Sequence, residues 1–483
     1  MPSFTSLGVP EALVRALTAS GITEPFPIQT ATLPATMTGS DVLGRGRTGS
    51  GKTLAFALPM VARLSGCRSA VRRPRGLVLA PTRELANQIA AVLAPLADIA
   101  GLRITTIFGG VSQHRQEIAL KDGVDIVVAC PGRLEDLLGQ KVLTLEAVEI
   151  TVLDEADHMA DLGFLPGVRR IMAATPTKGQ RMLFSATLDN GVDQIVRQFL
   201  HDPVRQSVDP EQSQIAEMTH HVFTVDSAET KRVVVEHLAS GLGRRLLFTR
   251  TKHQAKKLAK QLTAAGIPAV DLHGNLSQPA RERNLEAFST GAVRVLVATD
   301  IAARGIHVDA IELVVHVDPP AEHKAYLHRS GRTARAGSGG DVVTLVLPEQ
   351  ASDFRALSRQ AKITATPQPV RAGTPVLERL VGELAARVKP SAAPAAAAPS
   401  RTSSSRGGQT PSGRRHGSRG QASAAGRTAT SHAPAARRSG SSAGARTVST
   451  YTTSTPTSGG GAPRRSSAVE LSQRGSSGRR RSR

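Results

Sequence analysis

A glycine-rich segment, Gly46–Thr53, carries the clearest chemical signal, with the sequence GRTGSGKT. It matches G-x-x-x-x-G-K-[ST], a loop whose backbone N–H groups surround phosphates at the start of a helix. In this pattern the lysine reaches the outer phosphates and the next hydroxyl is available to Mg²⁺. We therefore expect a triphosphate site with a metal ion beside it. The residues assigned to this site are Thr48, Gly49, Ser50, Gly51, Lys52 and Thr53.

Residues 154–157, with the sequence DEAD, directly follow the apolar run Ile150–Leu153. Such a run is typical of a buried strand, whose end would place Asp154 beside the phosphate loop, where it can hold Mg²⁺. Glu155 can then orient and deprotonate an attacking water. Alone, the four residues could be a solvated acidic turn. Together with the phosphate loop they indicate hydrolysis of a phosphoanhydride, with Lys52 and Glu155 as catalytic residues.

Short apolar runs alternate with amphipathic stretches along the chain, which predicts an α/β fold with parallel sheets and right-handed crossovers. The rhythm stops at a polar stretch near residue 207 and then starts again, so we expect two tandem domains. The expected strands of the first domain are Asp41–Leu43, Gly76–Ala80, Ile104–Ile107, Asp125–Ala129, Ile150–Leu153 and Met182–Ser185. Those of the second are Leu246–Thr249, Ala269–Leu272, Val293–Thr299, Leu313–Val317 and Val342–Leu347.

The predicted domains cover residues 1–206 and 219–365, with a linker at 207–218. Apolar residues spaced from Val376 to Val388 favour one short helix within 366–388. Residues 389–483 are rich in Arg, Ser, Gly and Ala and almost free of large apolar residues, so we expect this tail to be disordered.

The charge balance indicates a polyanionic partner. Lys and Arg outnumber Asp and Glu 61 to 39, giving a net charge of +22. Sixteen arginines and one acid, Glu470, lie in residues 391–483. We expect this tail to hold nucleic acid electrostatically, although a biased genome could also produce such a composition.

Other features exclude several classes of protein. The two cysteines, Cys67 and Cys130, cannot form a disulfide scaffold and have no metal-ligand spacing. No apolar run reaches the roughly 18 residues of a membrane span. The first ten residues do not resemble a secretion signal, so we expect a cytoplasmic protein with no membrane partner.

These motifs resemble those of the DEAD-box RNA helicases of superfamily 2, over roughly residues 4–347 and in the family's order. The Q motif is assigned to residues 2–30, with GITEPFPIQ at 21–29 and an isolated upstream aromatic, Phe4. Further matching segments are Pro81–Ala86, Gly109–Gly110, Pro131–Arg133, Ser185–Thr187, Leu247–Thr251, Gln278–Arg281, Ala298–Gly305 and His328–Arg335.

The resemblance implies two RecA-like parallel-sheet domains that use ATP and Mg²⁺ and close on the nucleotide. The amide of Gln29 can pair with the N6 and N7 edge of adenine, which would select ATP over GTP. Family likeness adds Phe4 and His307 to the nucleotide site. It also makes Arg332 and Arg335, three residues apart on an expected helix, the catalytic arginines that contact the outer phosphates.

For RNA, the resemblance implies sugar–phosphate contacts that read no base edges, so binding should tolerate many sequences. We expect RNA to lie on the side away from the strand ends that hold ATP. The residues implied are Thr82, Arg83, Gly109, Gly110, Arg133, Gln278, Arg281 and Thr299. Those implied to couple hydrolysis to strand separation are Asp157, Ser185, Thr187 and His328, with His328 linking the second domain to Asp157 or Thr187.

The chain departs from the family pattern at three positions of interest. Ile22 stands where an aromatic residue usually stacks on adenine, and Cys130 replaces a threonine. His307 stands where an aspartate commonly contacts the ribose, so either a weaker contact or a solvent-facing side chain is expected. These departures bear on nucleotide affinity more than on the reaction.

The leading interpretation is an ATP-dependent RNA helicase that remodels RNA or ribonucleoprotein, with a monomeric core. Its partners would be single-stranded and short-duplex RNA, and ribosomal or degradation-machinery proteins are further candidates. An RNA-binding or annealing protein with a weak ATPase is the alternative, and a DNA-translocating relative is a third. The bacterial look of the sequence rests on its short core and lack of extra domains.

Overall fold

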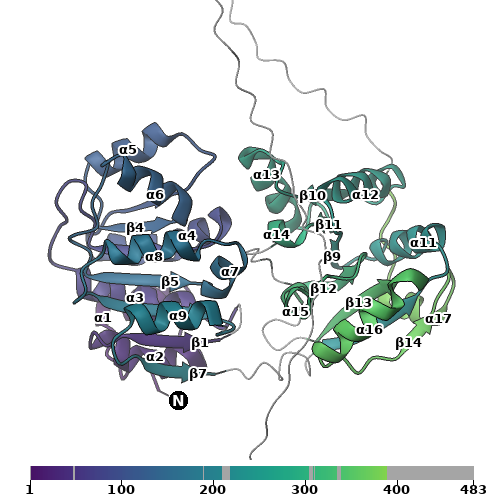
Figure 1. The fold of residues 1–483 in the computed structure, drawn as a ribbon, viewed down its shortest axis with the longest axis horizontal. Coiled ribbons are helices and arrows are strands. Elements are labelled where there is room, and N and C mark those ends of the chain that lie inside the picture. The colour runs from purple at the N-terminus through teal and green to yellow at the C-terminus, as the bar shows by residue number, and fades with distance from the viewer. Residues whose placement is uncertain are drawn as a thin grey trace, which may run out of the picture. The chain divides into compact units, whose positions relative to one another are not determined.

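The computed structural model describes residues 2–46, 49–188, 190–208, 218–303, 308, 310–333 and 339–388. Two seven-stranded sheets, each flanked by helices on both faces, organise this part of the chain (Figure 1). Every strand pair within them is parallel. The α/β class and the two tandem RecA-like domains predicted from the sequence are therefore confirmed.

The first sheet has the strand order β3-β4-β2-β5-β6-β1-β7. Its central strands are apolar along their whole length because both faces are covered. In β2, for example, Val78 belongs to the core on one face, while Leu77 and Leu79 belong to the core on the other. The strands are β1 (Val42–Arg45), β2 (Gly76–Leu79), β3 (Ile104–Ile107), β4 (Ile126–Ala129), β5 (Ile150–Asp154), β6 (Gln180–Ser185) and β7 (Val204–Ser207).

Nine helices among the described residues cover the two faces of this sheet. Four pack on one face, namely α1 (Glu11–Ala19), α2 (Pro27–Met37), α3 (Lys52–Leu64) and α4 (Arg83–Ile99). The other face is covered by α5 (Gln113–Lys121), α6 (Pro131–Gly139), α7 (Ala156–Asp161), α8 (Leu165–Ala173) and α9 (Asn190–Phe199).

The second sheet repeats this plan with the order β10-β11-β9-β12-β13-β8-β14. Its strands are β8 (Met218–Thr224), β9 (Arg244–Phe248), β10 (Ala269–Leu272), β11 (Val295–Ala298), β12 (Ile311–His316), β13 (Gly340–Val346) and β14 (Pro367–Pro369). One face carries α11 (Ala228–Ala239), α12 (Lys252–Ala264) and α17 (Pro375–Val381). The other carries α13 (Gln278–Ser289), α14 (Asp300–Ala303), α15 (His323–Ser330) and α16 (Ala351–Gln360), which a short 3₁₀ turn, η1 (Pro348–Gln350), precedes.

Each strand expected from an apolar run is present, within two residues or so at either end. Three further strands, β7, β8 and β14, were not predicted. In β7 the exposure alternates along a short edge strand, and β14 is fully exposed and contains two prolines. Neither sequence has an apolar run long enough to be recognised.

The helix expected within 366–388 is wrong in extent, because α17 ends at Val381. Gly382 follows with φ +65°, a conformation that stops the helix. Leu384 then forms a bridge to Gly241, and Leu384 and Val388 are both exposed. Residues 366–388 belong to the second domain, since β14 pairs with β8 and α17 packs in its core.

The expected disordered tail, the expected linker and the expected lack of a membrane span concern residues that the structure describes only in part. The tail 389–483 and most of the expected linker lie outside the described residues. Within the described part, no helix combines the length and apolar character that crossing a bilayer requires.

Arg245, on β9, holds the end of α17 against the rest of the second domain. This contact leads to a prediction about stability. Its buried guanidinium donates to the carbonyl oxygens of Leu238, Gly243 and Val381 at 2.5–2.7 Å. Replacing Arg245 by Met should lower the free energy of unfolding of this domain by about 3 kcal/mol, because three buried carbonyls lose their donor.

Urea denaturation followed by circular dichroism would measure this loss, since the chain has no tryptophan. Arg379→Met is the matched control, because Arg379 is exposed on α17, and it should change stability by less than about 0.5 kcal/mol. Equal transitions for the two variants would refute the assigned role of Arg245.

Candidate functional site

The carboxyl ends of β1, β6 and β5 bring three sequence motifs to one edge of the first sheet. These strands are neighbours in the order β5-β6-β1. The phosphate loop follows β1, Ser185–Thr187 lies at the end of β6, and the acidic residues 154–157 lie at the end of β5. Parallel strands end on the same edge, so segments far apart in sequence meet there.

The phosphate loop folds back on its own backbone in this structure. Lys52 is the first residue of α3, it is 7% exposed, and its Nζ donates to Gly46 O at 2.6 Å. Gly51 has φ +86°, and a Cβ at this position would lie 2.5 Å from Gln29 Nε2. Glycine is therefore required at this position both for its backbone conformation and for its small size. Thr48 lies outside the described residues.

Gln29 lies against the phosphate loop, as the resemblance implied, but its amide bonds to the protein. Its Oε1 accepts from Phe26 N and its Nε2 donates to Gly51 O, both at 2.9 Å, and the residue is fully buried. Each amide atom keeps capacity for one further hydrogen bond. Phe26, which the sequence analysis did not single out, is 52% exposed beside this amide and offers an aromatic face.

The expectation that Phe4 contacts nucleotide is not met by the geometry. Phe4 is 2% exposed and belongs to the hydrophobic core of the first domain. A side chain enclosed in this way supports the N-terminal segment rather than a ligand. Ile22, which replaces the usual aromatic residue, is also partly buried against that core.

The residues available for a divalent cation fit Mg²⁺. Asp154 ends β5 and is 3% exposed, and burial raises the pKa of its carboxyl to about 7, although Lys52 acts in the opposite direction. Such a buried carboxylate needs a positive charge to stay ionised. Thr53, the second residue of α3, would add a hydroxyl oxygen, and oxygen ligands are those Mg²⁺ prefers.

Glu155 pairs with His158, a residue that the sequence analysis missed. Both side chains are buried, and His158 Nδ1 lies 2.7 Å from Glu155 Oε2. Burial opposes ionisation of Glu155, but His158 and then Arg332 outweigh it and lower the pKa of this carboxyl far below its usual range. Burial likewise disfavours the imidazolium, yet Glu155 and Asp157 raise the pKa of His158.

The backbone at Glu155 adopts the left-handed conformation, with φ 51° and ψ 51°, as the N-cap of α7. Residues other than glycine seldom adopt this conformation, which costs on the order of 1 kcal/mol. The turn thus carries local strain at the residue expected to act as the base.

Asp157, Ser185 and Thr187, which the resemblance implied as coupling residues, are joined by hydrogen bonds in the structure. Asp157 Oδ2 accepts from Thr187 N at 3.0 Å and from Thr187 Oγ1 at 3.1 Å. Ser185 Oγ donates to Thr187 O at 2.7 Å and accepts from Asp157 N at 3.2 Å. Burial opposes the charge of Asp157, but His158 and His328 lower its pKa.

His328 contacts the turn after the acidic residues rather than Thr187. Its ring packs edge-on against His158 with centroids 4.7 Å apart, and its Nδ1 is 3.9 Å from Asp161 Oδ2. The expected link to the Asp157 region is therefore made through the neighbouring residues of α7.

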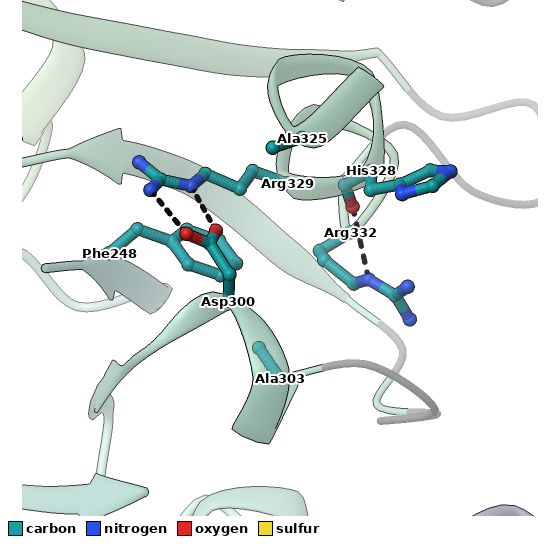
Figure 2. Close-up of a pocket in the computed structure, with 7 residues that line it drawn as sticks. All are labelled: Phe248, Asp300, Ala303, Ala325, His328, Arg329 and Arg332. Atoms are coloured by element: carbon teal, nitrogen blue, oxygen red, sulfur yellow. Dashed lines mark hydrogen bonds and ion pairs between the residues drawn. The ribbon is translucent and has the colours of Figure 1, made fainter. Parts of the chain in front are cut away.

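Arg329 and Arg332 lie on opposite sides of the segment that carries them (Figure 2). Arg329 is 2% exposed, forms a two-pronged ion pair with Asp300 and lies over the ring of Phe248. Arg332 and His328 project the other way, and Arg332 Nε donates to His328 O at 3.2 Å.

The expected helix through Arg332 is wrong, because α15 ends at Ser330. The next residues turn toward β12, where the hydroxyl of Thr333 bonds to Ile311 O. Arg335 and His307 lie outside the described residues.

The RNA-contact candidates of the first domain lie on the same sheet edge as the phosphate loop, which corrects the expected opposite side. Thr82 and Arg83 follow β2, the glycine pair follows β3, and Arg133 follows β4. In the strand order these three strands lie to one side of β5, and β6 and β1 lie to the other. One edge is thus divided between the two sets of residues.

Contacts among the candidates are specific. The guanidinium of Arg83 occupies the space beside Gly110, whose φ is +79°, so a side chain there would collide with it. Thr82 Oγ1 caps α4 by accepting from Leu85 N at 3.3 Å. Arg133 is mostly buried, and its Nη1 makes no hydrogen bond in the described structure.

Two RNA-contact candidates of the second domain, Gln278 and Arg281, form hydrogen bonds with Arg83 and Glu84 of the first domain. Arg281 Nε donates to Glu84 Oε1 at 2.5 Å, and Arg83 Nη1 donates to Gln278 Oε1 at 2.9 Å. Thr299 lies at the end of β11, where its N–H bonds to Leu272 O. The structure therefore brings Arg83, Gln278 and Arg281 together, with a buried glutamate that the sequence analysis did not name.

Cys130 occupies the N-cap of α6, where the family usually has a threonine, but its side chain makes no capping hydrogen bond. Burial raises the pKa of its thiol to about 12, with Glu84 adding to the effect. The group therefore stays a neutral thiol near pH 7 and is a weak donor.

The fold and this edge define a two-domain P-loop protein of the RecA-like class. Two family descriptions match the sequence: DEAD/DEAH box helicase over residues 26–195, and helicase conserved C-terminal domain over residues 230–337. The chain belongs to the DEAD/DEAH box helicase family.

Relatives and solved structures agree with this assignment. The chain is 39% identical to DEAD-box ATP-dependent RNA helicase 28 of Oryza sativa subsp. japonica, over 74% of this chain and 45% of that protein. It is 37% identical to ATP-dependent RNA helicase RhlB of Xanthomonas campestris pv. campestris (strain B100), over 77% of this chain and 67% of that protein. S. cerevisiae Dbp5 bound to RNA and ADP BeF3 superposes with a TM-score of 0.70 at 27% identity, over 79% of this chain and 99% of that chain. The chain thus spans less than half the length of the rice relative and about two thirds of the Xanthomonas one.

Arg281 generates a prediction for RNA binding. Replacing it by Ala removes the contact with Glu84 and a cation suited to a phosphate oxygen, so RNA affinity should fall about tenfold. The RNA concentration that gives half-maximal ATPase stimulation would measure this. Arg283→Ala, an exposed arginine on the same helix, is the control and should leave that concentration unchanged within about twofold.

Proposed function

We propose that this protein is an ATP-dependent RNA helicase that couples RNA-stimulated ATP hydrolysis to local separation of short duplexes. The observation that carries the proposal is the shared sheet edge, where Lys52, Asp154 and Glu155 follow one group of strands and the RNA candidates follow the adjoining group. Names of the matched relatives and the RNA-bound state of yeast Dbp5 support the same assignment.

The ATP half of the proposal assigns a role to each group on this edge. Lys52 holds the outer phosphates, Gln29 reads adenine, and Glu155 takes a proton from the attacking water. Asp154 and Thr53 would hold Mg²⁺, which neutralises developing phosphate charge when bound. Arg332, with Arg335, supplies cations from the second domain.

In the RNA half, arginine and threonine side chains and the glycine backbone hold sugar and phosphate without reading bases. The set assigned is Thr82, Arg83, Gly109, Gly110, Arg133, Gln278, Arg281 and Thr299. Asp157, Ser185, Thr187 and His328 then couple the two halves, because their contacts connect the acidic turn to the end of β6 and to the second domain.

Finer parts of the proposal rest on the sequence. They include residues 207–218 as the linker, the roles of Thr48 and His307 at the nucleotide, and binding of RNA by the arginine-rich tail. We also place in this proposal a monomeric core, a cytoplasmic location, and ribosomal or degradation-machinery proteins as further partners.

ATPase assays with RNA and with DNA of equal length and sequence test the proposal. Single-stranded RNA should raise the hydrolysis rate at least tenfold, while DNA should raise it far less. No stimulation by either polymer would favour an RNA-annealing protein with a weak ATPase. Equal stimulation by both would favour a DNA-translocating relative.

Glu155→Gln should abolish turnover while ATP binding persists. The amide keeps the size of the carboxylate but cannot accept a proton from water, so kcat should fall at least about 100-fold. Equilibrium binding of ATP, with Lys52→Ala as the control that loses it, separates binding from chemistry. Hydrolysis near the wild-type rate in the Gln variant would contradict the assigned role of Glu155.

His158 should act as a positioning residue for Glu155. His158→Leu leaves the buried carboxylate without this partner, and kcat should fall about tenfold with little change in KM for ATP. His158→Asn places an amide donor near the former Nδ1 and should restore most of the rate. A KM change with an unaltered kcat, or failure of Asn to outperform Leu, would argue for a purely structural role.

A further inference from the structure

A basic cavity of about 600 Å³ opens at the edge of the first sheet where β2, β5 and β6 begin. It lies outside every motif discussed above. Five cationic side chains line it against only two carboxylates. The charged lining residues are Arg63, Arg68, Arg73, Arg75, Lys178, Glu146 and Glu149.

Arg75 fixes one wall of this basic cavity. Its Nε and Nη2 donate to the carboxylate of Glu149 at 2.5 and 3.2 Å. Its Nη1 donates to Leu64 O at 2.9 Å and to Cys67 O at 2.8 Å. The guanidinium therefore joins the end of α3, the following loop and the start of β5.

The buried carboxylate of Asp125 holds the loop that carries Arg68 in place. The carboxylate of Asp125, which is 2% exposed, accepts from Ser69 N at 2.6 Å and from Arg103 N at 2.8 Å. These bonds to backbone N–H groups, together with Arg103 and against the effect of burial, lower the pKa of Asp125. The cavity wall is thus anchored by the fold rather than by a ligand.

Three of the cations have no counter-charge within the described residues. No ion pair is recorded there for Arg63, Arg68 or Lys178, whereas Arg75 is paired with Glu149 and Arg73 lies 3.7 Å from Glu146. The guanidinium of Arg63 lies against Gly39, whose φ is +93°. All three side chains are exposed, and together with Arg73 and Arg75 they give the cavity a net positive lining that attracts anions.

Gln180 fixes another part of the cavity wall. It is 4% exposed, and its Nε2 donates to Thr36 O at 2.9 Å and to Ser40 O at 2.8 Å. These bonds tie the start of β6 to the end of α2 and to the turn that follows it.

We propose that this cavity is a second ligand site, which binds a small molecule that carries at least two phosphate groups. Sugar bisphosphates and nucleotides have this chemistry. A volume of about 600 Å³ lies within the usual range for such ligands. Arginines supply forked donors to phosphate oxygens, and Lys178 supplies a further point charge.

The site is separate from the proposed catalytic and RNA edge. The strands between the two edges are four to six residues long, which corresponds to about 13–20 Å. A cavity of about 600 Å³ matches a compact ligand in size, whereas a strand of RNA would extend well beyond it.

Cys67 provides a local reporter for this test in the full chain. It is exposed and immediately precedes Arg68, whereas Cys130 is partly buried with a raised pKa and reacts poorly. A thiol-reactive fluorophore at Cys67 should respond to fructose 1,6-bisphosphate. No nucleotide is added, because ADP also carries two phosphates and would compete for the cavity. The arginine-rich tail is present in every sample.

The proposal expects a saturable response whose dissociation constant rises at least tenfold in Arg68→Ala/Lys178→Ala. Arg15→Ala/Lys121→Ala removes the same charge from exposed helices elsewhere in the domain and should leave the constant unchanged. Circular dichroism and urea denaturation of each variant verify folding.

Three outcomes would overturn the proposal. They are no response to fructose 1,6-bisphosphate, equal affinity in the two double variants, and a response to single-stranded RNA or a glutamate-rich peptide but not to the phosphorylated probe. Because the readout is binding without ATP or hydrolysis, the proposed helicase activity can fail while this site stands, and the reverse also holds.

Discussion

Burial of charge at the end of β5 is the constraint on which the rest of the structure depends. Asp154, Glu155 and Asp157 are all nearly inaccessible to water, and an isolated carboxylate in such a place costs several kcal/mol. Each therefore needs a polar or charged partner close by. His158 serves Glu155, and the N–H and hydroxyl of Thr187 serve Asp157. Satisfying these charges fixes how the ends of β5 and β6 lie together.

The residues proposed to bind ATP and those proposed to bind RNA share one edge of the first sheet, so the two sites are separated by only a few strands. β5 stands at the boundary, with β2 and the RNA candidates on one side and β6 and the phosphate loop on the other. A change at the nucleotide need only move the turns after adjacent strands to reach Arg83. Polar groups of the phosphate loop are satisfied within the protein, because Lys52 Nζ donates a hydrogen bond to Gly46 O and Gln29 Nε2 donates one to Gly51 O. Ligand binding must therefore exchange internal hydrogen bonds for external ones.

Most of the fold and the core of the site could be predicted from the sequence, because both depend on local patterns. Apolar runs mark buried strands, and fixed spacings mark the phosphate loop and the acidic turn. The edge strands β7 and β14 lacked this signal, since edges need little apolar surface. The helix expected to reach Val388 failed because the apolar spacing there faces solvent after Gly382.

Partners that arise only from folding escaped the sequence analysis. His158 looks like any helical histidine until the turn brings it to Glu155, although its place three residues beyond that carboxylate was a usable signal. Glu84 lies within a recognised motif, yet its pairing with Arg281 crosses 197 residues of sequence. The placement of Phe4 was wrong because an isolated aromatic residue fits a core as well as a ligand site.

The left-handed backbone at Glu155 affects how substitutions at this position change the stability of the turn. Glycine, and to a lesser degree asparagine, adopts that conformation more easily than glutamate. A substitution that removes the carboxylate can therefore relax the turn and even make the domain more robust. Loss of the carboxylate at this position therefore need not weaken the turn itself. The backbone conformation gives no reason for a glutamate there, whereas the proposed chemistry does.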